Sequence, residues 1–124
     1  MIHVEYKENP NKGTVQVTMT GHAQSAPFGE DLICAGSSAL AYTLMQNVIF
    51  AHEAEKFKRS PKIERKSGHM RVVVTPKEEH YNEVKTMFMT IMNGFLAIEY
   101  NFANRMSVRG IKHPEAKKVD FDLE

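Results

Sequence analysis

The apolar residues of this chain change spacing several times, from the two-residue repeat of strands to the longer repeat of helices. This alternation limits the possible folds more than any other feature. In the first twenty residues the alternating apolar positions are Ile2, Val4, Tyr6, Val15, Val17 and Met19. Turn-forming residues at 9–13 separate the two runs, so the segment predicts a β-hairpin with one apolar face.

Two longer segments have helical periodicity. From about Asp31 to Glu55 apolar residues recur at steps of three and four, and Thr75–Glu78 has the pattern of a capping box that starts a second helix. The apolar stripe of that second helix is Tyr81, Val84, Phe88, Ile91, Met92, Phe95 and Ile98. A second hairpin is predicted around Ser67 and Gly68, and a last strand over 119–123.

The order is therefore strand, strand, helix, strand, strand, helix, strand. It predicts an α+β fold of two layers (ββαββαβ), with a mostly antiparallel sheet and two helices on one face. The 124 residues suit a single domain, 1–124. An apolar content of 42% and a net charge of +1 are typical of a globular chain rather than a disordered one.

Composition also excludes several classes of function. The lone cysteine forms no internal disulfide, and no two of the six histidines have the four-residue spacing of helical metal ligands, so we expect no metal site and no cofactor. The near-neutral charge gives no general reason to expect nucleic acid as a partner. We see no apolar run of about 18 residues and no signal-peptide core, and therefore expect a cytoplasmic protein without a membrane partner.

The cysteine stands in a suggestive position. On a helix that begins near Asp31, Asp31, Cys34 and Ser38 share one face, and Cys34 lies in the first turn, where free N–H groups and the helix dipole favour a thiolate. His22 follows the second strand, and continued alternation would place it on the face away from the core. A histidine is a suitable general base at neutral pH, and a short loop can return it to the helix start.

The residues alone leave plainer interpretations open. A single cysteine on an amphipathic helix is commonly a small buried side chain. His22 could simply end a strand, Asp31 could start the helix, and Ser38 could bond a carbonyl one turn back.

A longer motif adds weight to the catalytic interpretation. Residues 21–40 contain Gly-His-Ala, a short loop, Gly-x-Asp, two aliphatic residues, Cys-Ala and then Ser-Ala-Leu. This motif resembles that of the ribosomal-processing cysteine proteases, the Prp family. The matching positions are Gly21, His22, Ala23, Gly29, Asp31, Cys34, Ala35, Ser38, Ala39 and Leu40.

The resemblance implies a specific activity. Members of this family form homodimers and remove a short N-terminal extension from large-subunit ribosomal protein twenty-seven in bacteria, cutting after a pair of phenylalanines. The catalytic cysteine and histidine would be Cys34 and His22, and Asp31 and Ser38 match motif positions with orienting or supporting roles. We further hypothesise that the apolar loop between the two catalytic positions binds substrate and moves. Its candidate contacts are Ala23, Phe28 and Gly29.

A basic segment supplies an alternative function. Residues 55–66 contain six Lys or Arg and two Glu. Such a patch would suit a non-catalytic module that binds the ribosome or RNA. No aromatic interleaving and no recognisable RNA-binding motif accompany it, so a solvated loop remains the plainer interpretation.

Overall fold

The computed structural model describes residues 1–22 and 28–111, and for residues 28–31 it describes the backbone alone. Along the chain the elements are β1 (Ile2–Asn9), β2 (Thr14–Thr20), α1 (Phe28–Glu53), β3 (Lys62–Lys66), β4 (His69–Val74), the 3-10 helix η1 (Glu78–His80), α2 (Tyr81–Asn101) and β5 (Met106–Arg109). Both predicted hairpins and both predicted helices are present.

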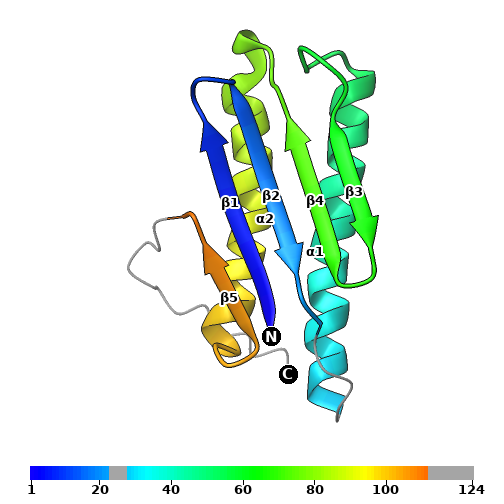
Figure 1. Ribbon diagram of the computed structural model, residues 1–124, viewed down its shortest axis with the longest axis vertical. Coiled ribbons are helices and arrows are strands. Elements are labelled where there is room, and N and C mark those ends of the chain that lie inside the picture. The colour runs from blue at the N-terminus through cyan, green and yellow to red at the C-terminus, as the bar shows by residue number, and fades with distance from the viewer. Residues whose placement is uncertain (23–27, 112–124) are drawn as a thin grey trace.

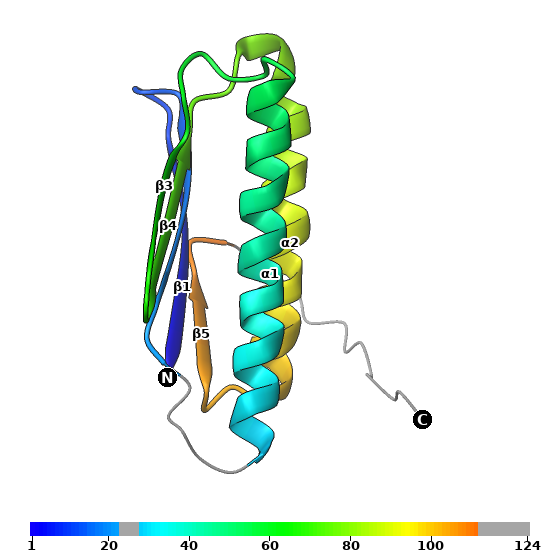
Figure 2. The ribbon, with the colours of Figure 1, turned by 90° about the vertical axis from the view of Figure 1, so that its right-hand side faces the viewer.

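The strands form one sheet in the order β3-β4-β2-β1-β5 (Figure 1). Three of the four pairings are antiparallel, whereas β5 lies parallel to β1, with Val4 opposite Val108. Both helices cover the same face of the sheet, so the molecule has two layers (Figure 2). The predicted α+β fold, with two helices on one face of a mostly antiparallel sheet, is confirmed.

The core lies between these layers. Alternating strand residues such as Val4, Val17 and Val72 face the helices and are almost completely buried. From α2, the predicted stripe contributes its buried members, which are Val84, Phe88, Ile91, Met92 and Phe95. Burying this apolar surface is the main favourable contribution to folding, and the two-residue and helical repeats explain which side chains take part.

Several predicted boundaries are wrong. The helix α1 begins at Phe28, three residues before Asp31, so Phe28 and Gly29 are helical rather than part of a loop. Pro76 does not start a helix: it pairs with Phe57 in an isolated β-bridge, and α2 begins at Tyr81. The fifth strand is β5 at 106–109, which was not expected, and the predicted strand at 119–123 lies outside the described residues.

The hydropathy of α1 was also underestimated. Within the described residues, Leu32–Glu53 is long and apolar enough, by length and composition, to cross a membrane, with a mean hydropathy of 1.3. The expectation that no segment reaches this level is therefore wrong. Core helices of folded domains have the same composition, and Ile33, Leu44 and Val48 of α1 are buried in the core of this fold.

Candidate active site

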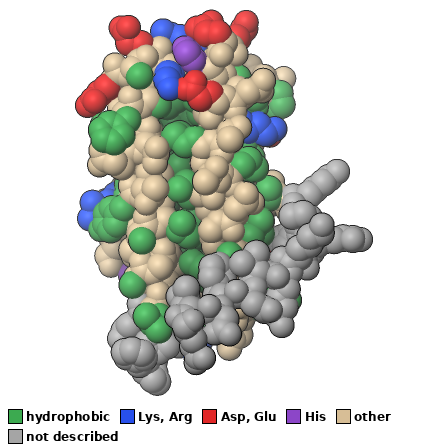
Figure 3. All heavy atoms as spheres, turned by 180° about the vertical axis from the view of Figure 1, so that it is seen from behind, with side chains coloured by type: hydrophobic (Ala, Val, Ile, Leu, Met, Phe, Trp, Pro, Cys, Tyr) green, Lys and Arg blue, Asp and Glu red, His purple; other side chains and the backbone are tan. Residues whose placement is uncertain are grey.

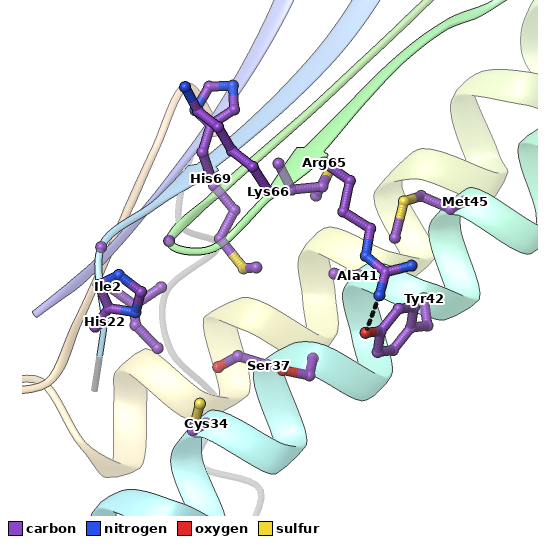
Figure 4. Close-up of a pocket in the computed structure, with 15 residues that line it drawn as sticks. Ile2, His22, Cys34, Ser37, Ala41, Tyr42, Met45, Arg65, Lys66 and His69 are labelled. Atoms are coloured by element: carbon purple, nitrogen blue, oxygen red, sulfur yellow. Dashed lines mark hydrogen bonds between the residues drawn. The ribbon is translucent and has the colours of Figure 1, made fainter. Parts of the chain in front are cut away.

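A pocket of about 150 Å³ is lined by residues of α1 and by residues at the end of β2, at the end of β3 and at the start of β4. Cys34 of α1 lines it on one side, and His22, which follows β2, lines it on the other (Figure 4). Ser38 of α1 also lines the pocket. The lining also includes the apolar side chains of Met45 and Met70. The fold thus brings the cysteine and the histidine of the sequence motif to one concave site.

Cys34 is a free, exposed thiol, and Figure 4 shows its sulfur projecting from α1 towards the pocket. The alternative that Cys34 is a small buried core residue is therefore wrong. Its predicted place in the first helical turn is also wrong, because α1 begins six residues earlier, at Phe28. Only the first four N–H groups of a helix lack helical partners, so the N–H of Cys34 is not free to bind an oxyanion.

His22 is exposed and lines the pocket on the side that faces α1. The prediction that strand alternation would carry it to the opposite face is wrong. The reason is Gly21, whose φ of +102° breaks the alternation directly before His22. This backbone conformation is readily available to glycine alone, so Gly21 is what turns the histidine towards the helix.

The remaining motif residues are placed to different degrees. Ser38 is half-buried and lines the pocket one turn after Cys34. Asp31, Phe28 and Gly29 lie in the first turns of α1, but their side chains are outside the description. Ala23 is likewise outside the described residues. The roles assigned to these four in substrate binding or orientation stay predictions.

Sequence reasoning missed Ser37, the neighbour of Ser38. It lies on the buried stripe of α1, lines the pocket, and is only 1% exposed. Its Oγ has no hydrogen-bond partner among the described residues. Ser37 follows Ile33 by four residues, and this helical spacing puts both on the core face of α1. The spacing is the signal in the sequence that could have identified Ser37.

Arg65 also lines the pocket, beside Tyr42 (Figure 4), and sequence reasoning missed it too. From β3 it reaches across to α1, where Nη2 donates to the Tyr42 hydroxyl at 2.7 Å. The guanidinium also lies over the Tyr42 ring, 4.6 Å from its centroid, in a cation–π contact. Nothing in the sequence separates Arg65 from its basic neighbours, because only the pairing of β3 with β4 turns it towards the helix.

Parts of the basic segment 55–66 are engaged with neighbouring side chains. Lys56 pairs with Glu83, and Arg65 is bonded to Tyr42. In the same segment, the pKa of Glu64 is lowered, mainly by the hydrogen bond with His69. The nearby charge of Arg71 lowers it further. Among the described residues no group of three or more His, Cys, Asp or Glu is arranged to hold a metal ion.

A thiol and an imidazole that face one pocket are the pair that a cysteine peptidase requires. The comparisons with known proteins agree with this class. The family model described as cysteine protease Prp matches residues 1–107. This chain therefore belongs to the cysteine protease Prp family, a family of proteases that act in ribosomal processing.

Individual relatives share 28–39% of their residues with this chain over the aligned segments. The ribosomal processing cysteine protease Prp of Bacillus subtilis is 39% identical over 49 residues, which is 40% of this chain and 44% of that protein. The match to Prp of Staphylococcus aureus (strain Mu50) is 28% identical over 113 residues and covers 88% of this chain and all of that protein, 100%. The short first match spans less than half of its relative, whereas the second extends over nearly the whole domain.

Solved structures share the fold. The crystal structure of an essential ribosomal processing protease Prp from S. aureus with a covalently linked product peptide has a TM-score of 0.63 and 24% identity, covering 88% of this chain and 98% of that one. A second structure of that protease, with a substrate peptide, has a TM-score of 0.61 over the same shares. At 24% identity, this structural similarity shows that the two proteins share a fold.

Proposed function

We propose that this protein is a cysteine endopeptidase of the bacterial cytoplasm that removes a short N-terminal extension from large-subunit ribosomal protein twenty-seven, cutting after a Phe-Phe pair. The observation that carries the proposal is that Cys34 of α1 and His22, from the segment after β2, line one pocket. Family membership supports it, and the S. aureus relatives bind substrate and product peptides.

In the proposed reaction the sulfur of Cys34 attacks the scissile carbonyl carbon, and His22 accepts the thiol proton. His22 then donates a proton to the leaving amine, which leaves the N-terminal fragment bound to sulfur as a thioester. Water attacks the thioester, and the thiol and a new carboxylate are released. Asp31 and Ser38 would support this pair by orienting His22 or the substrate. Because the N–H of Cys34 is inside the helix, the oxyanion needs another donor.

The pocket is suitable for an apolar residue next to the cleaved bond. Met45, Met70 and Ile2 contribute flexible or aliphatic walls, and Met side chains adapt well to aromatic rings. An aromatic side chain that leaves water for such a pocket gains roughly 1.5–3 kcal/mol. This chemistry supports a phenylalanine at the cleavage site.

The deciding experiment uses a synthetic peptide with a Phe-Phe extension junction, with products identified by mass spectrometry. Wild type should cut after the second phenylalanine, whereas Cys34→Ala should leave the peptide intact and His22→Ala should retain only a small residual rate. His52→Ala is the matched control, because His52 is exposed in the last turn of α1 and does not line the pocket. An intact peptide with wild type, or full activity in Cys34→Ala, would refute the proposal. RNA binding by such an inactive protein would instead favour the binding-module alternative.

We also propose that the protein is a homodimer, as the family resemblance implies. The outer surface of α1 supports this. Residues 32–51 contain no charged side chain, and the exposed large apolar side chains of α1 are Leu32, Tyr42, Ile49 and Phe50. Figure 3 shows hydrophobic side chains along this helical face, while charged groups gather at one end. Exposed apolar patches of this kind commonly mark protein interfaces.

Sedimentation velocity tests the dimer directly. Wild type should sediment as a dimer, and Phe50→Glu should shift it to a monomer by placing a charge on the apolar surface. Glu53→Gln, one turn further along α1, is the control and should remain dimeric. A wild-type monomer at all concentrations would contradict the proposal.

A further inference from the structure

The imidazole of His22 lies directly against the turn between β3 and β4. A Cβ added at Gly68, in that turn, would overlap Nε2 of His22 and would lie 2.8 Å from Cε1 and 3.0 Å from Cδ2. Three atoms of one ring therefore occupy the space that any side chain at position 68 requires. Gly68 also has a φ of +71°, in the left-handed region.

Backbone hydrogen bonds hold this turn in place relative to His22. The N–H of Gly21 donates to the carbonyl oxygen of Gly68 at 3.0 Å. The adjacent strands are paired as well, with Thr20 opposite His69. The turn and the residue before His22 are therefore joined, so the turn cannot retreat from the ring without breaking sheet pairing.

We propose that Gly68 is a positioning residue for His22: the absence of a side chain at this turn sets where the imidazole sits in the pocket opposite Cys34. The catalytic consequence of this inference rests on the proposed function. The contact between the His22 ring and the turn at Gly68 is independent of that function. A side chain at position 68 displaces the ring, because the ring turns about two single bonds and is exposed, whereas the turn is fixed.

The expected result is a loss of turnover rather than of substrate binding. In Gly68→Ala the displaced imidazole no longer meets the Cys34 thiol in the correct geometry. A displacement of about 1 Å can cost about a hundredfold in rate. The apolar walls at Met45 and Tyr42 are untouched, so kcat should fall about a hundredfold while KM stays within about twofold.

The chain provides a matched control in its other hairpin. Gly13, between β1 and β2, has a φ of +65°, and a Cβ there would have nothing within 4 Å. Gly13→Ala therefore introduces the same backbone strain without the overlap, and should keep wild-type kcat. Gly68→Asn gives a second test, because Asn tolerates positive φ better than Ala yet still has a Cβ. It should fold at least as well as Gly68→Ala and lose the same turnover.

Two measurements show whether Gly68 acts through His22. In the His22→Ala background, adding Gly68→Ala should leave the residual rate unchanged, because the group being positioned is already absent. In NMR spectra the carbon-bound ring protons of His22 should shift in Gly68→Ala and in Gly68→Asn, and keep their wild-type positions in Gly13→Ala.

The outcomes separate this inference from the proposed function. Equal kcat values for Gly68→Ala and Gly13→Ala, or unmoved His22 ring signals in Gly68→Ala, would overturn the positioning role. A further loss of rate on adding Gly68→Ala to His22→Ala would overturn it too. If wild type cleaves no peptide but the ring signals shift as expected, the contact stands and the proposed peptidase function fails.

Discussion

Replacing Ser37 by alanine should stabilise the protein, although the residue lies beside the proposed nucleophile. Ser37 is 1% exposed and its Oγ has no partner among the described residues. Leaving a buried hydroxyl unpaired costs about 1–3 kcal/mol. Alanine also favours a helix interior over serine by about 0.5 kcal/mol. Loss of packing around the removed oxygen offsets part of this gain, so we expect the free energy of unfolding to rise by roughly 1 kcal/mol.

Urea unfolding and calorimetry measure this effect. A gain of about 1 kcal/mol corresponds to a rise of roughly 3–5 °C in Tm for a domain of this size. Ser38→Ala is the matched control, since its side chain is half-buried and open to water; it should gain only the difference in helix propensity. A loss of stability in Ser37→Ala beyond about 0.5 kcal/mol would refute the reasoning, because it would mean that Oγ is hydrogen-bonded in the folded protein.

Three further predictions concern the scaffold. Gly21→Ala should destabilise the protein by roughly 1–3 kcal/mol in urea unfolding, because φ is +102° and the added Cβ would overlap the Met1 carbonyl; unchanged stability would contradict this. Leu44→Ala, at a site 0% exposed, should cost about 2–5 kcal/mol by the same measurement, and a loss under 1 kcal/mol would show that the core collapses around the gap. The Tyr81 hydroxyl donates a hydrogen bond to Glu8, and this bond is the main reason why the pKa of the Glu8 carboxyl is lowered. The stabilisation from this bond should therefore be complete above pH 4.5 and decline as pH falls through the lowered pKa of Glu8 in the folded protein. In Tyr81→Phe the pKa of Glu8, followed by NMR, should rise towards 4.5, and an unchanged value would contradict the assignment.

The same Glu8–Tyr81 pair acts in the opposite direction at high pH. The hydrogen bond to Glu8 raises the pKa of Tyr81 to about 12. A raised phenol pKa means that the folded state retains its proton longer than the unfolded state. On the alkaline side, the contribution of this pair is therefore complete up to pH 10 and is lost as pH rises towards 12.

The fold shows why a short motif can define a site. Residues 21–40 begin directly after β2 and run through the first half of α1, so a few residues join the two elements. The pocket also needs the β3–β4 hairpin, which begins only at Lys62. Gly68 and Arg65 come from this hairpin, and their contacts with His22 and Tyr42 have no counterpart in the motif.

The order of the main elements was readable from sequence because it depends on local periodicity. Alternation in the first twenty residues and the stripe of α2 reflect which side chains leave water, and burial of those side chains followed as expected. The motif around Cys34 identified the family for a similar reason: its residues are close in sequence, so their spacing survives in a linear pattern. Boundaries were less predictable: the start of α1 lies three residues before the predicted one, and the bridge between Phe57 and Pro76 pairs residues far apart in the chain.

Sequence by itself therefore determined the two-layer class, the apolar core stripes, and the pairing of Cys34 with His22 as candidates. Only the tertiary structure decided that Cys34 is exposed, that Gly21 turns His22 towards α1, and that Gly68 and Arg65 border the same pocket. The physical reason is that side-chain repeats report on burial along one element. The direction of a side chain after a left-handed glycine, and the neighbours it meets, depend on how separate strands pair.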